Sequence, residues 1–168
     1  MTVTTVRKDP QTLSMVLEAE FDASPERVWQ LWADPRKLER WWGPPTYPAT
    51  FTKHNLAPGS RVEYYMTGPE RDQHHGYWEV VEVEAPRRLV FRDGFANAEG
   101  VPNADLPVST ANVRIEELSQ GRTRMLIQSV FPSTEAMEQV LAMGMEEGLK
   151  QAVGQIDAIL AEDSVAKR

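Results

Sequence analysis

The side chains that most often carry acid–base or metal chemistry are sparse in this chain. It has three histidines, His54, His74 and His75, and no cysteine among 168 residues. His74 and His75 are neighbours in a predicted strand, so they should point to opposite faces and cannot hold one metal ion together. His75 would act as a base only if it faced a cavity with Asp93 nearby, and a solvated histidine at a loop edge is the more ordinary interpretation.

Sequence motifs for zinc, nucleophile and phosphate sites are absent as well. The chain has no HExxH pair, no GxSxG elbow, no GxGxxG turn and no P-loop. The lack of cysteine also excludes disulfides, thiolate metal ligands and a cysteine nucleophile. We therefore expect no metal and no cofactor, assign no catalytic residue, and prefer a binding protein over an enzyme.

The composition is that of a globular protein without a basic or membrane-spanning region. Hydrophobic residues make up 41% of the chain, charged residues 26%, and the net charge is −7. Lys and Arg form no cluster beyond Arg87-Arg88, so we expect no nucleic-acid partner. No apolar run approaches the roughly 18 residues of a membrane span, and residues 1–10 lack the apolar core of a signal peptide. A cytoplasmic protein is expected.

Two kinds of hydrophobic periodicity predict one α+β domain over residues 12–162. Alternating apolar residues from Leu13 to Phe21 predict a half-buried strand. Ser24-Pro25 and Asp34-Pro35 each combine a capping side chain with a proline suited to a first helical turn, so two short helices should follow. Six further strands joined by short turns imply an antiparallel meander; they cover residues 49–53, 62–66, 75–84, 89–95, 108–118 and 123–131. Residues 1–11 are predicted to be a flexible arm, and 163–168 a tail.

A single long helix is predicted from residue 132 to residue 162. Its apolar residues recur at helical spacing: Met137, Leu141, Met145, Leu149, Val153, Ile156 and Leu160. One apolar stripe must be buried, so the helix should lie across the sheet. Gly144 and Gly148 lie beside this stripe, at a cost of about 1 kcal/mol each relative to alanine. Either they leave room for a ligand, or they allow a close approach to the sheet or to a partner helix.

Several aromatic residues and one long loop are candidates for a binding site. Trp41 and Trp42 project about 100° apart on a helix, so one indole can fill the core while the other borders an opening. Tyr64 and Trp78 carry polar groups that need a partner when buried, so each has either a ligand contact or a structural role. The loop from Asp93 to Pro107 is either a lid or binding loop, or a packed surface excursion or dimer arm.

Five short motifs occur in the order expected for a known superfamily. They are Phe21-Asp22-Ala23-Ser24-Pro25-Glu26-Arg27-Val28-Trp29, Trp41-Trp42-Gly43-Pro44, Pro58-Gly59-Ser60-Arg61, Glu82-Val83-Glu84-Ala85-Pro86-Arg87-Arg88-Leu89-Val90-Phe91 and Gly144-Met145-Glu146-Glu147-Gly148. With them, residues 12–162 resemble the SRPBCC superfamily of START-like and birch-pollen-allergen-like proteins. Within it, the chain resembles the branch related to the C-terminal domain of the activator of heat-shock protein 90 ATPase.

The resemblance implies a helix-grip fold, in which a curved seven-stranded antiparallel sheet wraps around the long C-terminal helix and leaves a cavity between them. It also implies that the cavity binds a hydrophobic or aromatic small molecule, as superfamily members do. The alternatives are a cyclase-, aromatase- or hydrolase-like enzyme using the same cavity, and a protein-interaction or stress-response module acting as a homodimer. We expect the cavity to be lined by Trp42, Tyr64, Met66, Trp78, Phe91, Phe95, Met125, Ile127, Met137, Met145, Gly148 and Leu149.

Overall fold

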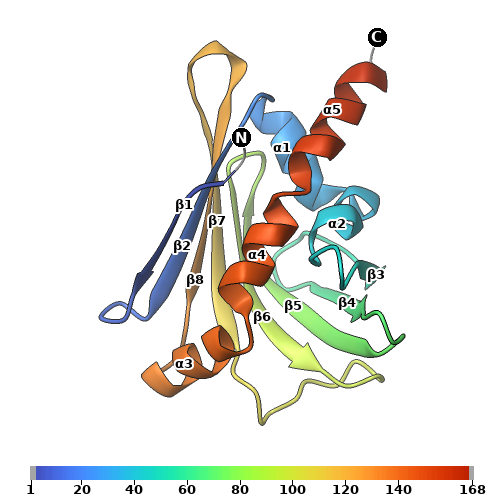
Figure 1. Ribbon diagram of the computed structural model, residues 1–168, viewed down its shortest axis with the longest axis vertical. Coiled ribbons are helices and arrows are strands. Elements are labelled where there is room, and N and C mark those ends of the chain that lie inside the picture. The colour runs from blue at the N-terminus through green and yellow to red at the C-terminus, as the bar shows by residue number, and fades with distance from the viewer. Residues whose placement is uncertain (1–2, 167–168) are drawn as a thin grey trace.

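A single antiparallel sheet of eight strands dominates the computed structural model, which describes residues 3–166 (Figure 1). The strand order is β1-β2-β8-β7-β6-β5-β4-β3, so β1 and β3 are the edges. The strands are β1 Val3–Asp9, β2 Ser14–Phe21, β3 Ala49–Lys53, β4 Arg61–Thr67, β5 Gln73–Glu84, β6 Arg88–Ala96, β7 Ser109–Glu117 and β8 Thr123–Val130. The predicted α+β class and helix-grip arrangement are confirmed, with one strand more than the seven expected.

The additional strand is β1, where the sequence predicted a flexible arm over residues 1–11. It pairs with β2 from Val3 to Asp9, and Leu13 at φ 53° helps to turn the chain between the two strands. Val6 packs partly buried against the core, whereas Thr5, Arg7 and Lys8 are not buried. An edge strand with so little buried apolar surface has a weak alternating pattern, which explains why the prediction was wrong there.

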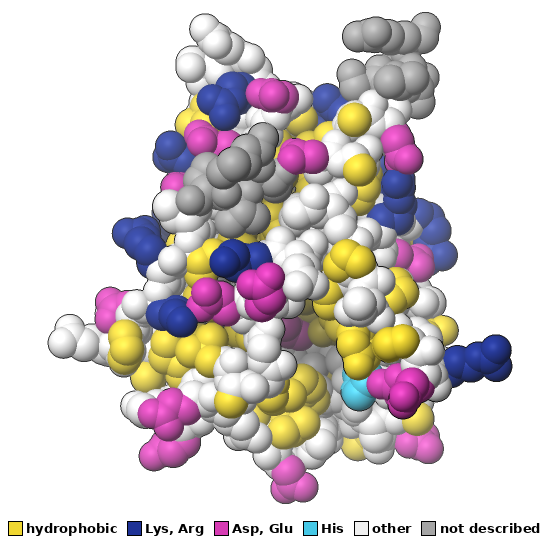
Figure 2. Space-filling view, viewed as in Figure 1, with side chains coloured by type: hydrophobic (Ala, Val, Ile, Leu, Met, Phe, Trp, Pro, Cys, Tyr) yellow, Lys and Arg dark blue, Asp and Glu magenta, His cyan; other side chains and the backbone are white. Residues whose placement is uncertain are grey.

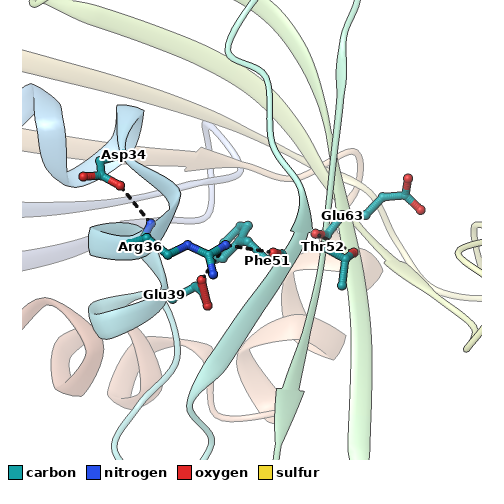
Figure 3. Close-up of polar contacts among 6 residues, drawn as sticks. All are labelled: Asp34, Arg36, Glu39, Phe51, Thr52 and Glu63. Carbon is teal, nitrogen blue, oxygen red and sulfur yellow. Dashed lines mark hydrogen bonds and ion pairs between the residues drawn. The ribbon is translucent and has the colours of Figure 1, made fainter.

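The two short helices, α1 Pro25–Ala33 and α2 Pro35–Trp41, begin at the predicted caps. Ser24 Oγ accepts a hydrogen bond from the Arg27 backbone N–H at 3.3 Å, and Asp34 Oδ1 accepts one from Arg36 N–H at 2.9 Å. The Arg36 guanidinium then donates to the Phe51 carbonyl of β3 at 3.4 Å and pairs with Glu39 at 2.8 Å (Figure 3). These contacts fasten α2 to the sheet edge, where the Thr52 hydroxyl of β3 donates to the Glu63 carbonyl of β4 at 3.3 Å (Figure 3).

The C-terminal helix is three consecutive helices that cross the sheet, not the continuous helix that was predicted (Figure 1). They are α3 Thr134–Ala142, α4 Met145–Val153 and α5 Ile156–Ala166. Gly144, with φ 89°, separates α3 from α4, and Gly154 separates α4 from α5. The helix also continues through residues 163–166, which were predicted to be a tail; residues 167 and 168 of that tail lie outside the described residues.

The helices are buried at their two ends and not in the middle. At one end Ala152, Val153, Ile156, Ile159 and Leu160 enter the main core, which holds most of the buried aromatic side chains. At the other end α3 places Ala136, Met137 and Val140 in a second cluster with Met15 and Phe131. Between these anchors α4 crosses the sheet without a buried residue before Ala152. Within the described residues, no helix is long and apolar enough to cross a membrane.

Candidate ligand-binding cavity

A cavity of about 330 Å³ lies under the span of helix between the two anchors. Its walls come from the segment after α2, from the inward face of β4, β6, β7 and β8, and from α3 and α4. The lining residues are Trp42, Pro44, Tyr47, Tyr64, Met66, Asp93, Gly94, Phe95, Ser109, Ala111, Ser129, Val140, Met143, Gly144, Met145, Gly148 and Leu149. On the side shown in Figure 2 the surface is hollowed, and hydrophobic side chains gather around the hollow.

The helical wall has open space at its two glycines. A Cβ atom placed on Gly144 or on Gly148 would meet no other heavy atom within 4 Å. The glycines therefore do not serve a close approach of helix to sheet within this chain. At Gly144 the positive φ of 89° is an additional reason for glycine, because it allows the turn between α3 and α4.

The sheet wall contributes a short row of polar groups. The Tyr64 hydroxyl of β4 donates a hydrogen bond to Asp93 Oδ1 of β6 at 3.1 Å. Asp93 pairs with Ser109 in the sheet register, and Ala111 pairs with Ser129, so these inward side chains follow one another across β6, β7 and β8. Because both serines are buried, this row is enclosed on an otherwise mostly apolar surface.

Asp93 is the one carboxyl group in the cavity wall, and no basic side chain lines the wall among the described residues. Burial raises the pKa of Asp93 to about 7, and the hydrogen bond from Tyr64 offsets part of that rise. Burial, followed by the nearby Asp93 charge, also raises the pKa of the Tyr64 hydroxyl well above its ordinary value. At neutral pH the Asp93 carboxyl group is therefore partly protonated and partly ionised.

Aromatic rings enclose the region around this carboxyl group. The rings of Trp42 and Tyr64 meet edge to face with centroids 6.1 Å apart, and Tyr47 and Phe95 complete the aromatic part of the lining. The Trp42 indole N–H is buried without a hydrogen-bond partner, although it lies close enough to Tyr64 to lower that hydroxyl's pKa slightly. Trp41, its neighbour, is fully buried and donates to the Leu31 carbonyl at 2.9 Å. One indole thus fills the core and the other borders the cavity, as predicted for this pair.

A second, more open hollow of about 790 Å³ adjoins the cavity. The two share Tyr47, Met66, Phe95 and Met143. The loop after β6 contributes Asn97, Ala98, Asn103 and Leu106 to the outer hollow, and β5 contributes Gln73, His74 and His75. The long loop therefore borders the approach to the cavity.

The family follows from the sequence match that covers most of this architecture. Residues 22–161 match the family described as Activator of Hsp90 ATPase homolog 1-like protein. The chain belongs to this family. Among curated proteins, no relative matches the chain.

Solved structures of other proteins share the fold, and two of them share about half of the sequence. A solution NMR structure of a protein from Arthrobacter aurescens is 51% identical, with a TM-score of 0.92 over 96% of this chain and 93% of the other. A crystal structure of a protein from Mycobacterium smegmatis is 48% identical, with a TM-score of 0.87 over 94% of this chain and 96% of the other. The AHSA1 protein from Silicibacter pomeroyi, 22% identical with a TM-score of 0.70 over 89% of this chain and 99% of the other, shares the fold.

The structure brings together seven of the residues that the sequence proposed for the cavity of this family member. They come from the segment after α2, from β4 and β6, and from α4: Trp42, Tyr64, Met66, Phe95, Met145, Gly148 and Leu149. Their location at the cavity wall is a geometric finding, and their contact with a ligand stays a prediction.

The remaining five proposed residues lie in the packed core instead of the cavity wall. Trp78 and Phe91 stack on each other with centroids 4.0 Å apart and are both fully buried. Met125 is fully buried, and its sulfur accepts a hydrogen bond from the Trp32 indole at 3.3 Å. Ile127 packs in the main core and Met137 in the second cluster, so neighbouring side chains occupy the space that a ligand would need.

Asp93 lines the cavity but was not among the lining residues expected from the sequence. The sequence placed it where the predicted strand 89–95 overlaps the polar loop, whereas β6 continues to Ala96 and points Asp93 inward opposite Trp78. The alternation of Phe91, Asp93 and Phe95 is the signal that identifies its face. His75 points to the opposite face of the sheet, where its ring packs 5.4 Å from Tyr65, so the condition for its acting as a base beside Asp93 is not met.

The histidines have other surroundings. His54 Nε2 lies 2.9 Å from the Trp32 carbonyl, and His74 Nε2 lies 2.6 Å from Asp72 Oδ2. Across the part of the chain that the structure describes, no group of three or more His, Cys, Asp or Glu side chains is arranged to hold a metal ion.

Proposed function

We propose that this protein binds a hydrophobic or aromatic small molecule in the cavity between α3–α4 and the sheet. The observation that carries the proposal is the open space at Gly148, beneath a helix whose two ends are firmly packed. A helix anchored in this way cannot collapse onto the sheet without disturbing both clusters. The space it spans is therefore preformed.

The size and lining of the cavity suit a ligand of one or two rings. Ligand sites in proteins run from about 300 to 1,000 Å³, and are mostly apolar with a few oriented polar groups. The present cavity of about 330 Å³ is at the small end of that range, with Met, Leu and aromatic side chains around one short polar row. Burial of apolar surface supplies the affinity, and the polar row orients the ligand.

The substitution Gly148→Leu tests the site directly. A leucine side chain there would extend into the open space, so we expect binding of the neutral fluorescent probe N-phenylnaphthylamine to weaken by about tenfold or more. Ala158→Leu, which places a leucine at an exposed position of α5, should leave the affinity unchanged. Circular dichroism checks that both variants fold. If the Gly148→Leu variant bound N-phenylnaphthylamine with wild-type affinity, the cavity would not be the binding site.

Asp93 favours a second candidate, an enzyme that uses the same cavity. A carboxyl group with a pKa near 7 suits a general acid or base at neutral pH. Native mass spectrometry of the protein purified from its own cell separates the two candidates. A binding protein returns its captured ligand unchanged, whereas an enzyme converts it and loses that conversion in Asp93→Asn.

A further inference from the structure

We propose that the cavity selects hydrophobic amines, whose ammonium group pairs with Asp93 beside the rings of Trp42 and Tyr64. The inference rests on the proposed function, because it names the chemical class of ligand for the same cavity. Three features support it: a carboxylate without a cation, aromatic rings next to that carboxylate, and an apolar cavity wall around the space for the rest of the ligand.

Asp93 needs a positive partner that the described residues do not supply. Its Oδ1 accepts a hydrogen bond from the neutral Tyr64 hydroxyl at 3.1 Å, and no lysine, arginine or histidine lines the cavity within residues 5–162. An unpaired carboxylate is costly to bury, so a half-buried carboxylate without a cation favours a ligand that brings one. A neutral ligand would leave this charge unpaired, and an anionic ligand would be repelled.

The rings beside Asp93 add to the same preference. Trp42 and Tyr64 adjoin each other in the cavity wall, and Tyr64 contacts Asp93 directly. A cation near the face of an aromatic ring is attracted by the ring's electrons, most strongly in desolvated sites. The ring or chain that carries the ammonium group would lie against Met145, Gly148 and Leu149 on the helical side.

Pairing with an ammonium ion couples ligand binding to the protonation of Asp93. The other titratable groups in the cavity wall are Tyr64 and Tyr47. Tyr77 lies on the reverse face of the sheet, against Gly94. The outer hollow is lined by His74 and His75. The pKa of Asp93 is about 7, whereas burial raises the pKa of the Tyr64 hydroxyl well above its ordinary value. Below pH 7, the affinity for an amine should therefore increase about tenfold for each unit by which the pH is raised. Above pH 7, where Asp93 is ionised, the affinity should level off.

A matched ligand pair tests this inference with the full chain. Naphthylmethylamine and naphthalenemethanol have the same ring and linker, and are compared by their competition with N-phenylnaphthylamine. At pH 8 we expect the wild-type protein to bind the amine at least about tenfold more tightly than the alcohol. Asp93→Asn should abolish that preference, because the amide carries no charge to pair with the ammonium group. Asp105→Asn, which removes an exposed carboxylate of the outer loop, should keep the preference.

The outcomes separate the two proposals. Equal affinity of the wild-type protein for amine and alcohol would overturn the amine inference, while the binding function would stand. A preference for the amine that survives in Asp93→Asn would also overturn it, because the selectivity would then arise elsewhere. Failure of N-phenylnaphthylamine and of both test ligands to bind would reject the binding function itself.

Discussion

Asp93 and Tyr64 show how one polar contact inside an apolar wall changes the chemistry of a cavity. The hydroxyl stabilises the carboxylate through a hydrogen bond, but burial has the larger effect and raises the pKa of Asp93 to about 7. Its side chain is half-buried in the cavity wall, so water compensates the charge less well than it would at the protein surface. A site of this kind binds a proton or a ligand cation, and so responds to pH near neutrality.

This pKa makes the stability of the protein depend on Asp93. The folded pKa lies above the unfolded value of 3.8, so the folded state holds the proton more tightly. The resulting stabilisation is fully present in acid and is lost as pH rises from about 4 to about 7. Asp93→Asn lacks this titration and still offers a carbonyl to Tyr64. We expect the variant to gain about 2–3 kcal/mol relative to wild type between pH 5 and pH 8, measured by urea unfolding.

The free energy of unfolding of the variant is compared with that of wild type at each pH. The contributions of the exposed carboxylates, which both proteins share, therefore cancel. Asp72 and Glu146 have lowered pKa values, because each contacts a basic partner, and their contributions are lost only in more acidic solution. A difference between variant and wild type that stays constant from pH 5 to pH 8 would show that Asp93 is ionised throughout.

The two glycines of the helical cavity wall, Gly144 and Gly148, are required for different reasons. Gly144 has φ 89° and lies in the turn between α3 and α4, whereas Gly148 lies within α4. Both face open space, so neither is required by packing against this chain. Glycine is required for the backbone at position 144, while at position 148 only its lack of a side chain matters.

Alanine substitution at these two glycines should therefore change stability in opposite directions. Gly148→Ala removes the entropic cost of glycine in a helix and should stabilise the protein by up to about 1 kcal/mol. Gly144→Ala forces a Cβ into a left-handed backbone and should destabilise it by about 1–2 kcal/mol. Thermal unfolding of the two variants measures both effects. A gain of stability at position 144 would contradict the turn that separates α3 from α4.

At the scale of the whole molecule, a few polar contacts connect the helices to the elements that frame the cavity. Gln155, between α4 and α5, donates from Nε2 to the Gly43 carbonyl at 2.7 Å, just before Pro44 and Tyr47 of the cavity wall. Arg40 of α2 pairs with Glu162 of α5 at 2.5 Å, and Lys8 of β1 pairs with Glu146 of α4 at 2.7 Å. The cavity therefore depends on contacts between segments that lie far apart in the sequence.

Of these contacts, the one made by Gln155 should matter most. Gln155→Ala leaves the Gly43 carbonyl without its donor, so we expect a loss of about 1–2 kcal/mol and weaker binding of N-phenylnaphthylamine. Arg40→Ala breaks an exposed ion pair and should cost less than about 1 kcal/mol without changing probe binding. Urea unfolding and fluorescence titration of both variants measure these effects. Equal losses of stability and probe affinity in the two variants would contradict the larger role assigned to Gln155.

The order of elements and most of their bounds followed from the sequence alone, because they depend on local signals. Alternating apolar residues identified β2, and Ser24-Pro25 and Asp34-Pro35 identified the starts of α1 and α2. These signals act over a few residues, so no tertiary contact is needed to detect them. Where the local signal was weak, as in β1, the prediction failed.

The suggested homodimer stays a prediction.

The division of buried residues between cavity and core was decided by the tertiary structure. Phe91, Met125 and Phe95 were all expected to line the cavity, but inward-facing residues look alike in a sequence. Phe91 stacks on Trp78 and Met125 accepts a hydrogen bond from Trp32, whereas Phe95 meets the open space under α4. That space exists because both ends of the helical segment are packed and Gly148 adds no side chain between them. Only long-range packing places Asp93 beside it.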